Sequence, residues 1–465
     1  MTNLITRFAP SPTGNLHIGS ARTALINFIV SSQNKNSKFY IRIEDTDKSR
    51  SKNEFKINIL NGLKWLGLKW DNEPQIQSQN IKRHLQIANE LLKNNFAYKC
   101  ACSEEKLEKK RRSISSGKTI SKKICTECKD NVDVQSLDKN YVIRIKIPED
   151  GNQILHDLIQ GEVKVKNNEI DDYVIIRKNN TPTYMLSVVV DDHDLGVNFI
   201  IRGDDHLNNY FRQKFIYEYM DWEIPKYAHL PLIHGDDGLK LSKRHGSINL
   251  IDLKEQGYLP NAIINNLILL GWAPSNQKDE KIDLSDIIKE FNIKNLSKSS
   301  SIFNYTKLNF FNNYYLKKDE NLNLFINYCK NNTILKKFYE LNYEKLILVF
   351  NIYKKEISKY DEMLSISKIY FDDNFSIDIS KRFEKEFDDI YYDFLKLIID
   401  NNNWEHENLS LTIKDFLNRK KIKFPVLGKP VRYLLTNSLN GPSITDIFMI
   451  LGKQQSINRL KKYNF

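Results

Sequence analysis

The sequence predicts an α/β fold with a doubly wound parallel sheet, interrupted by an inserted α+β domain and followed by all-helical domains. Three observations support it. Strand-like runs alternate with helical periodicity over the first hundred residues and again from about residue 197 to 250. Several short strand-like segments lie between these two regions. Beyond residue 255 the periodicity is mostly helical, and 465 residues are enough for several domains.

The first strand and the turn after it predict a phosphate-binding loop. Residues 4–8 (LITRF) read as a strand that ends where Pro10 removes a backbone N–H. The turn APSPTGNLHIGS (9–20) leads into a helix with His17 in its first turn. A helix N-terminus after such a turn attracts anions, and Gly19 would let one approach closely. A lone histidine there is also often a solvated or structural residue.

The remaining elements complete the α/β pattern around the insert. In the parallel sheet we expect strands at 38–47, 197–206 and 227–235, with helices at 53–66, 79–95 and 207–221. In the insert we expect strands at 141–148, 161–166 and 171–178. The strand expected at 38–47, KFYIRIEDTD, ends in acidic residues at the edge of the sheet where ligands of open α/β sheets bind.

Charge and hydropathy limit the class of protein. Lys and Arg number 70 against 58 Asp and Glu, a net charge of +12 that suits a polyanionic partner such as nucleic acid. The chain is also rich in Lys, Asn and Ile, as base-composition bias alone can produce, so the charge by itself decides little. No charged-then-apolar leader opens the sequence and no apolar run approaches a membrane span. We therefore expect a cytoplasmic protein without membrane contact.

Four of the five cysteines lie close together in the sequence. Cys100 and Cys102 form a Cys-x-Cys pair, and after 22 intervening residues Cys125 and Cys128 form a Cys-x-x-Cys pair. Two such pairs can present four thiolates tetrahedrally to a structural Zn²⁺. Four reduced thiols are the alternative interpretation, because the gap in the first pair is tighter than usual. The basic stretch KKRRSISSGK (109–118) lies between the two pairs.

A second cationic loop lies about half-way along the chain. Residues 239–246 read LKLSKRHG, so that Lys240, Lys243 and Arg244 surround a serine just after a GDDG turn. A charge run alone is most often a solvated surface. Paired with the first loop, these cations could close on a triphosphate.

Together the two loops resemble the signature motifs of class I aminoacyl-tRNA synthetases. More narrowly, the segments TRFAPSPTG, IRIEDTD, PTYMLSVVVDDHDLGVNFIIRGDDH and HLPLIHGDDGLKLSKRHG are similar to bacterial-type glutamyl-tRNA synthetases. The resemblance is dense from residue 5 to about 316 and weaker afterwards, although KPVRYLLTNSLNGPSITDIFMILGK is similar to the C-terminal end of the family. Ser20 and Leu241 depart from the histidine and methionine common in the wider class, and neither change removes a charge.

The resemblance implies a Rossmann-type catalytic domain that activates L-glutamate with Mg²⁺ and ATP to glutamyl-adenylate, releasing pyrophosphate, and then transfers the glutamyl group to the 3′ end of tRNA(Glu). The implied catalytic residues are His17, Lys240 and Lys243. Those implied for ATP are Thr13, His17, Gly19, Lys243 and Arg244. Those implied for glutamate are Arg7, Ala9, Ser11, Glu44, Tyr184 and Arg202. Some members of the family hold zinc in the insert, and we expect a monomer.

The resemblance also divides the chain into domains. The expected parts are two halves of the catalytic domain at 1–99 and 184–250, an acceptor-end-binding insert at 100–183, a stem-contact domain at 251–320 and a helical anticodon-binding region at 321–465. Glutaminyl-tRNA synthetases differ in their opening turn, typically of the Pro-Pro-Glu-Pro-Asn-Gly type, and in a β-barrel anticodon module.

Three alternatives to this function remain at this point. The enzyme could also charge tRNA(Gln) with glutamate, because the helical region that would decide this resembles the family least. It could be an inactive tRNA-binding paralogue, against which His17, Lys240 and Lys243 are intact. A nucleotidyltransferase for a small metabolite would not need some two hundred helical residues after the second loop.

Replacing either of two cationic or hydrogen-bonding side chains should slow adenylate formation. We expect Lys243→Ala and His17→Ala each to reduce the rate by roughly 10²-fold or more, because each removes a donor used mainly in the transition state. ATP–pyrophosphate exchange measures the rate, and the affinity for glutamate should change less. If a variant activates glutamate at the parental rate, the catalytic role predicted for the replaced residue is wrong.

Overall fold

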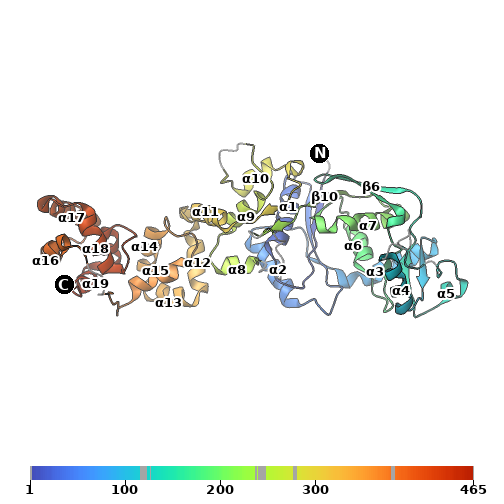
Figure 1. The fold of residues 1–465 in the computed structure, drawn as a ribbon, viewed down its shortest axis with the longest axis horizontal. Coiled ribbons are helices and arrows are strands. Elements are labelled where there is room, and N and C mark those ends of the chain that lie inside the picture. The colour runs from blue at the N-terminus through green and yellow to red at the C-terminus, as the bar shows by residue number, and fades with distance from the viewer. Residues whose placement is uncertain are drawn as a thin grey trace. The chain divides into compact units, whose positions relative to one another are not determined.

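A computed structural model describes residues 3–115, 123–125, 127–235, 238, 248–275, 280–378 and 383–463. The chain forms two compact units (Figure 1). The first comprises Met1–Lys254 with Pro260–Lys307, and the second comprises Glu255–Leu259 with Leu308–Phe465. Within these described ranges, no helix is both long enough and apolar enough to cross a membrane.

The first unit is built on parallel strands, which confirms the predicted α/β class. These strands are β1 (Ile5–Phe8), β2 (Lys38–Ile43), β3 (Gln75–Ile76), β9 (Phe199–Gly203) and β10 (Lys226–Leu230). The amide of Asn198, just before β9, donates to the carbonyl of Ile5 in β1 (3.2 Å). The strands pair as two sheets, β1-β2-β3 and β7-β6-β10-β9, and this bond and the contacts between β1 and β9 join them in the order β3-β2-β1-β9-β10, whose direction of growth reverses between β1 and β9. A hairpin of β6 (Asn152–Asp157) and β7 (Gly161–Lys166) extends the sheet beyond β10.

Helices pack against this sheet because apolar residues recur along them. Helix α1 (Ile18–Ser32) contacts β1, β2 and β9. Helices α3 (Ile81–Lys93), α6 (Tyr184–Asp194) and α7 (Leu207–Tyr219) share a core with Ile200 of β9 and Tyr227 of β10. Helix α2 (Asn53–Trp65), expected at 53–66, buries Ile59 and Leu63 on one face.

The insert carries its own small antiparallel sheet. Its strands are β4 (Ala97–Cys100), β5 (Val142–Ile145) and β8 (Val174–Ile176), accompanied by α4 (Glu104–Ser115) and α5 (Val132–Ser136). Among the described residues of the insert, a separate small core consists of Tyr98, Cys100, Leu107, Cys125 and Cys128, while other residues of the same strands, such as Ile143 and Ile176, pack in the larger core with α3, α6 and α7. A core of this size provides little hydrophobic stabilisation.

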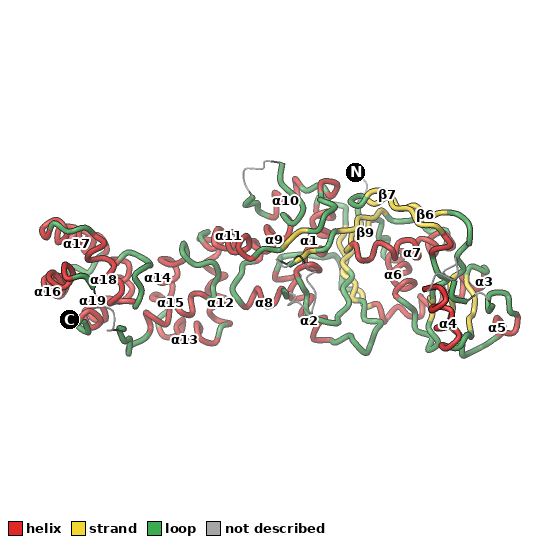
Figure 2. The backbone as a smooth tube through the Cα atoms, in the orientation of Figure 1, coloured by secondary structure: helices red, strands yellow, loops and turns green. Residues whose placement is uncertain are grey.

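The rest of the chain is helical, as the periodicity predicts, and helices dominate this part of Figure 2. Helices α8 (Leu250–Glu255), α9 (Pro260–Ile268), α10 (Leu284–Glu290) and α11 (Tyr305–Leu316) come first. They are followed by α12 (Leu322–Asn331), α13 (Thr333–Leu341), α14 (Tyr343–Tyr353), α15 (Glu362–Phe371), α16 (Lys385–Asp400), α17 (His406–Lys420), α18 (Phe424–Thr436) and α19 (Ile444–Leu460). A two-residue strand, β12 (Ser301–Ile302), interrupts them and pairs with β11 (Ile233–His234).

Three predicted boundaries differ from the structure. His17 does not belong to the first helical turn: its backbone is extended, and it caps α1 because its Nδ1 accepts from the Ser20 amide (3.3 Å). The strand expected at 38–47 ends at Ile43, so its acidic residues lie in the following loop. The strand expected at 227–235 is split into β10 and β11 around Pro231, which has no N–H for a ladder.

Candidate active site

A cavity of about 550 Å³ lies at the carboxyl ends of β1 and β9, beside the N-terminus of α1. This is where the strand order reverses, which is the usual place for a ligand in an open α/β sheet. Eight of the residues that the sequence singles out line it: Arg7, Ala9, Ser11, His17, Gly19, Glu44, Tyr184 and Arg202. Segments up to 195 residues apart in the chain therefore meet at one site.

A buried carboxylate, Asp192 of α6, organises one side of this cavity. Arg7 of β1 donates its Nε to both carboxylate oxygens (3.0 and 3.2 Å), and Arg42 of β2 donates Nη1 to Oδ1. Burial alone would raise the pKa of Asp192, but Arg42 and Arg7 lower it below its usual range. The carboxylate therefore remains ionised and fixes two guanidinium groups at the ends of neighbouring strands.

Glu44 is the acidic group of the cavity. Its Oε1 accepts a hydrogen bond from Arg42 Nη2 (3.0 Å), and its side chain is 7% exposed. Burial raises the pKa of Glu44 despite the opposing charge of Arg42. A cation placed at this carboxylate, such as a ligand ammonium, would favour its ionised form.

Arg202 of β9 supplies a second cation to the cavity. Its guanidinium lies over the ring of Tyr227, with 5.4 Å between the central carbon and the ring centroid. Tyr184, at the first position of α6, also lines the cavity, and burial raises the pKa of its hydroxyl. A neutral hydroxyl beside two arginines and a carboxylate suits a small zwitterion that carries more than one carboxylate.

His17 is the N-cap of α1 and contacts Ser20 in the first turn of that helix. Its Nε2 is 2.9 Å from Ser20 Oγ, so the serine that departs from the wider class pattern contacts the histidine directly. A Cβ on Gly19 would be only 3.2 Å from two atoms of the imidazole. The glycine therefore leaves room for the His17 ring, a role the sequence did not suggest.

Of the implied ATP residues that the structure describes, His17 and Gly19 line the cavity and Thr13 does not. Thr13 is in the same loop, where its amide donates to the carbonyl of Ser11 (2.8 Å), but it is not part of the lining. Lys240, Lys243 and Arg244 lie outside the described residues. Their roles stay predictions from the sequence.

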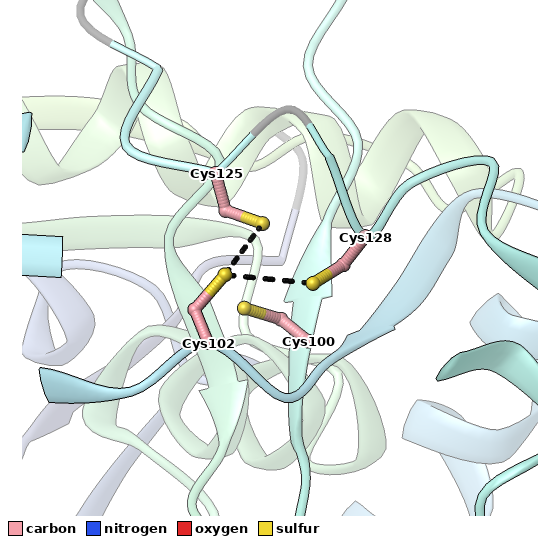
Figure 3. Close-up of side chains that lie close together, drawn as sticks. All are labelled: Cys100, Cys102, Cys125 and Cys128. Atoms are coloured by element: carbon pink, nitrogen blue, oxygen red, sulfur yellow. Dashed lines mark hydrogen bonds between the residues drawn. The ribbon is translucent and has the colours of Figure 1, made fainter. Parts of the chain in front are cut away.

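The four clustered cysteines meet in the insert (Figure 3). Their sulfur atoms all lie within 4.8 Å of one another, and Cys102 Sγ is 3.5 Å from the sulfurs of both Cys125 and Cys128. Zn–S bonds of about 2.3 Å in a tetrahedron place sulfurs about 3.8 Å apart, so the cluster has the size of a Cys₄ zinc site. A hydrogen bond with Cys125 lowers the pKa of Cys100 to about 4.

Sequence reasoning missed the charged residues beneath the cavity. Arg42 and Asp192 stand inside apolar segments, KFYIRI and VVVDDHD, and are 0% and 1% exposed. His229 in YAHLP is likewise fully buried. The available signal was a charged or polar residue at an inward position of an apolar run, because such a group needs a buried partner.

Comparison with known proteins agrees with this geometry. Residues 3–310 match the family described as tRNA synthetases class I (E and Q), catalytic domain, and residues 323–464 match an anticodon binding domain. The sheet, its ligand cavity and the two matches define a class I aminoacyl-tRNA synthetase.

Relatives over the full chain give the family. A glutamate--tRNA ligase 2 of Wolbachia sp. subsp. Brugia malayi is 39% identical over 99% of this chain and 100% of its own, and one of Ehrlichia chaffeensis is 40% identical over 99% and 98%. The crystal structure of a glutamate tRNA ligase from Elizabethkingia meningosepticum, in complex with its amino acid, has a TM-score of 0.86 at 27% identity and 99% coverage of both chains. The chain belongs to the glutamate--tRNA ligase family.

Removing the buried carboxylate should destabilise the first unit. Asp192→Ala leaves Arg7 and Arg42 buried without their shared partner, so we expect the free energy of unfolding to fall by about 3–5 kcal/mol. Asp194→Ala is the control, because Asp194 pairs with the partly exposed Arg83 and should cost at most about 1 kcal/mol. Hydrogen exchange of amides in β1 and α6 reports the change for this unit alone. Equal effects of the two variants would contradict the role of Asp192.

Proposed function

We propose that the protein activates L-glutamate with ATP and transfers it to tRNA(Glu). The observation that carries this proposal is the pairing, in one cavity, of a buried carboxylate, Glu44, with two guanidinium groups, Arg7 and Arg202. Glutamate carries one ammonium and two carboxylates, which are complementary to that set. Family membership and the full-length relatives support the same reaction.

Activation needs positioning and charge neutralisation more than covalent chemistry by the protein. The glutamate α-carboxylate attacks the α-phosphorus of Mg·ATP, the adenylate forms and pyrophosphate leaves. His17 at the start of α1, with Lys240 and Lys243 of the second loop, would neutralise the developing charge on phosphate oxygens. Thr13, Gly19 and Arg244 would contact ATP in the same region.

The second step uses the same cavity. A ribose 2′-hydroxyl at the 3′ end of the tRNA attacks the adenylate carbonyl, the ester bond forms and AMP leaves. Ala9 and Ser11, in the turn after β1, would hold the amino acid through both steps together with Tyr184. Residues 323–464, which match an anticodon binding domain, would contact the far end of the same tRNA.

Aminoacylation of purified tRNAs tests this function and its main alternative. With labelled glutamate and ATP, charging of tRNA(Glu) alone supports the proposal as stated. Charging of tRNA(Gln) as well would make the enzyme non-discriminating. Binding of tRNA(Glu) without charging or ATP–pyrophosphate exchange would indicate the inactive paralogue and would contradict the proposal.

We also propose that Cys100, Cys102, Cys125 and Cys128 hold one structural Zn²⁺. Four sulfurs at this spacing suit Zn²⁺ better than a hard cation, and a four-sulfur site leaves no open position for catalysis. When bound, the ion would cross-link the end of β4 to the loop after α4. The small core of the insert makes such a cross-link valuable for folding.

The cavity should reject glutamine. A neutral amide opposite Arg202 leaves a buried charge unpaired at a cost of about 2–5 kcal/mol, so exchange with glutamine should be at least about 30-fold slower than with glutamate. Arg202→Ala should lose this discrimination, whereas Arg212→Ala, which removes a partly exposed ion pair with Asp171, should keep it. Similar rates for both amino acids in the parent would overturn the assignment.

Zinc content should depend on the cysteine cluster. Protein purified without chelator should contain about one zinc per chain, and Cys125→Ser should lose it because three sulfurs bind more weakly than four. Cys329→Ser, at a buried cysteine of α12, should retain zinc. Elemental analysis gives the content, and tRNA charging should fall more than pyrophosphate exchange. Zinc far below one per chain in the parent would contradict the zinc site and favour the alternative interpretation of four reduced thiols.

A further inference from the structure

Arg202 is held by two side-chain partners that leave one nitrogen for a ligand. Its Nε donates to His229 Nε2 (3.1 Å), and its Nη1 donates to Gln213 Oε1 (2.8 Å). In the part of the chain that the structure describes, the buried Nη2 has no hydrogen-bond partner. Arg202 lines the cavity, and its Nη2, which other atoms cover in this structure, is the guanidinium nitrogen whose missing partner a bound carboxylate would supply.

His229 can accept from Arg202 only in one neutral tautomer. Its Nδ1 lies 2.7 Å from Asp157 Oδ2, and a carboxylate accepts, so the ring proton is on Nδ1. Nε2 then has the lone pair that accepts from Arg202 Nε. Both the His229 and the Asp157 side chains are 0% exposed, and burial lowers the pKa of His229, which favours the neutral ring.

Asp157 is itself locked in orientation at the end of β6. Its Oδ1 accepts from the backbone amides of Ile159 (2.9 Å), Gln160 (2.8 Å) and His229 (3.2 Å). The other oxygen, Oδ2, is thereby directed at His229 Nδ1. Burial would raise the pKa of Asp157, but the hydrogen bonds from His229 and these amides lower it, so the group is a carboxylate.

We propose that Asp157 and His229 are positioning residues that act through Arg202. The carboxylate selects the His229 tautomer, and that tautomer holds the guanidinium with Nη2 toward the glutamate carboxylate. This inference rests on the proposed function, in which Arg202 binds glutamate. It assigns a role in amino-acid selection to β6, a strand of the hairpin at the sheet edge, through the parallel pairing of β6 with β10.

The substitution Asp157→Asn should reverse the tautomer while keeping the shape of the side chain. Three backbone donors require an oxygen at the Oδ1 position, so the amide NH₂ must occupy the Oδ2 position and donate to His229 Nδ1. The ring proton then moves to Nε2, where it faces the Nε–H of Arg202. Two donors repel, and the guanidinium must move.

Two substitutions of His229 separate its contact with Arg202 from its contact with Asp157. A glutamine amide reaches about as far as imidazole Nε2 and can accept from Arg202, whereas an asparagine amide reaches only the Nδ1 position. His229→Gln should therefore keep the hydrogen bond from Arg202 Nε, and His229→Asn should lose it. His229→Gln keeps an acceptor for Arg202 but leaves Asp157 Oδ2 without its partner, whereas His229→Asn keeps a donor to Asp157 but loses the acceptor for Arg202, so the pair separates the two contacts.

Kinetics of ATP–pyrophosphate exchange test the proposal. We expect Asp157→Asn and His229→Asn to raise KM for glutamate by about 10- to 100-fold and to weaken rejection of glutamine, since a displacement near 1 Å can cost that much. KM for ATP should stay within about twofold, and His229→Gln should stay within about threefold of the parent for glutamate. ¹⁵N-histidine NMR should show the His229 proton on Nδ1 in the parent and on Nε2 in Asp157→Asn.

Parental KM for glutamate in folded Asp157→Asn and His229→Asn would overturn the proposal, as would equal losses in His229→Gln and His229→Asn. If Asp157→Asn does not fold, the comparison of His229→Gln with His229→Asn tests the proposal. Failure of the proposed function is distinguishable, because the parent would then show no exchange with glutamate. An Arg202→Ala variant that still discriminates glutamate from glutamine would show that Arg202 does not select the amino acid, and would overturn this inference as well.

Discussion

One buried carboxylate, Asp192, is the constraint on which the rest of the site depends. Taking Arg7 and Arg42 out of water is costly unless each guanidinium keeps a charged partner, and both share this one. Helix α6 must therefore stay in register with strands β1 and β2. That register places Tyr184, at the other end of α6, in the cavity, and Arg42 in turn holds Glu44.

The topology explains why ligand-facing groups gather at one edge of the sheet. Strand order reverses between β1 and β9, so loops leaving these two strands diverge and open a cavity. The N-terminus of α1 adds a favourable field for anions at the same edge, while the amides of Ile18 and Ser20 are already bonded to the Ile248 carbonyl and to His17. A site assembled in this way selects by charge, since burial makes each unpaired arginine or carboxylate expensive. Adenylate formation and transfer to tRNA then need few further protein groups.

Much of the fold and the cavity lining could be predicted from the sequence. Local periodicity placed β1, β2, α1, α2 and α7 to within a few residues, and the Pro/Gly turn identified the ligand edge. Helix α6 was missed because Val188, Val189 and Val190 obscure its periodicity. The pairs Arg42–Asp192 and Asp157–His229 could not be predicted, because they join elements 150 and 72 residues apart and local patterns carry no information on such contacts. The cysteine spacing predicted proximity, and the structure brings the four sulfurs together.

The central claim is that the cavity recognises glutamate through Glu44 and the buried arginines. A crystal structure of the protein with L-glutamate bound tests it most directly. The account predicts the ammonium within hydrogen-bond distance of Glu44 and a glutamate carboxylate against Nη2 of Arg202, with Asp192 still bridging Arg7 and Arg42. Glutamate bound elsewhere, or bound in this cavity with its ammonium away from Glu44 and no carboxylate at Arg202, would contradict the account.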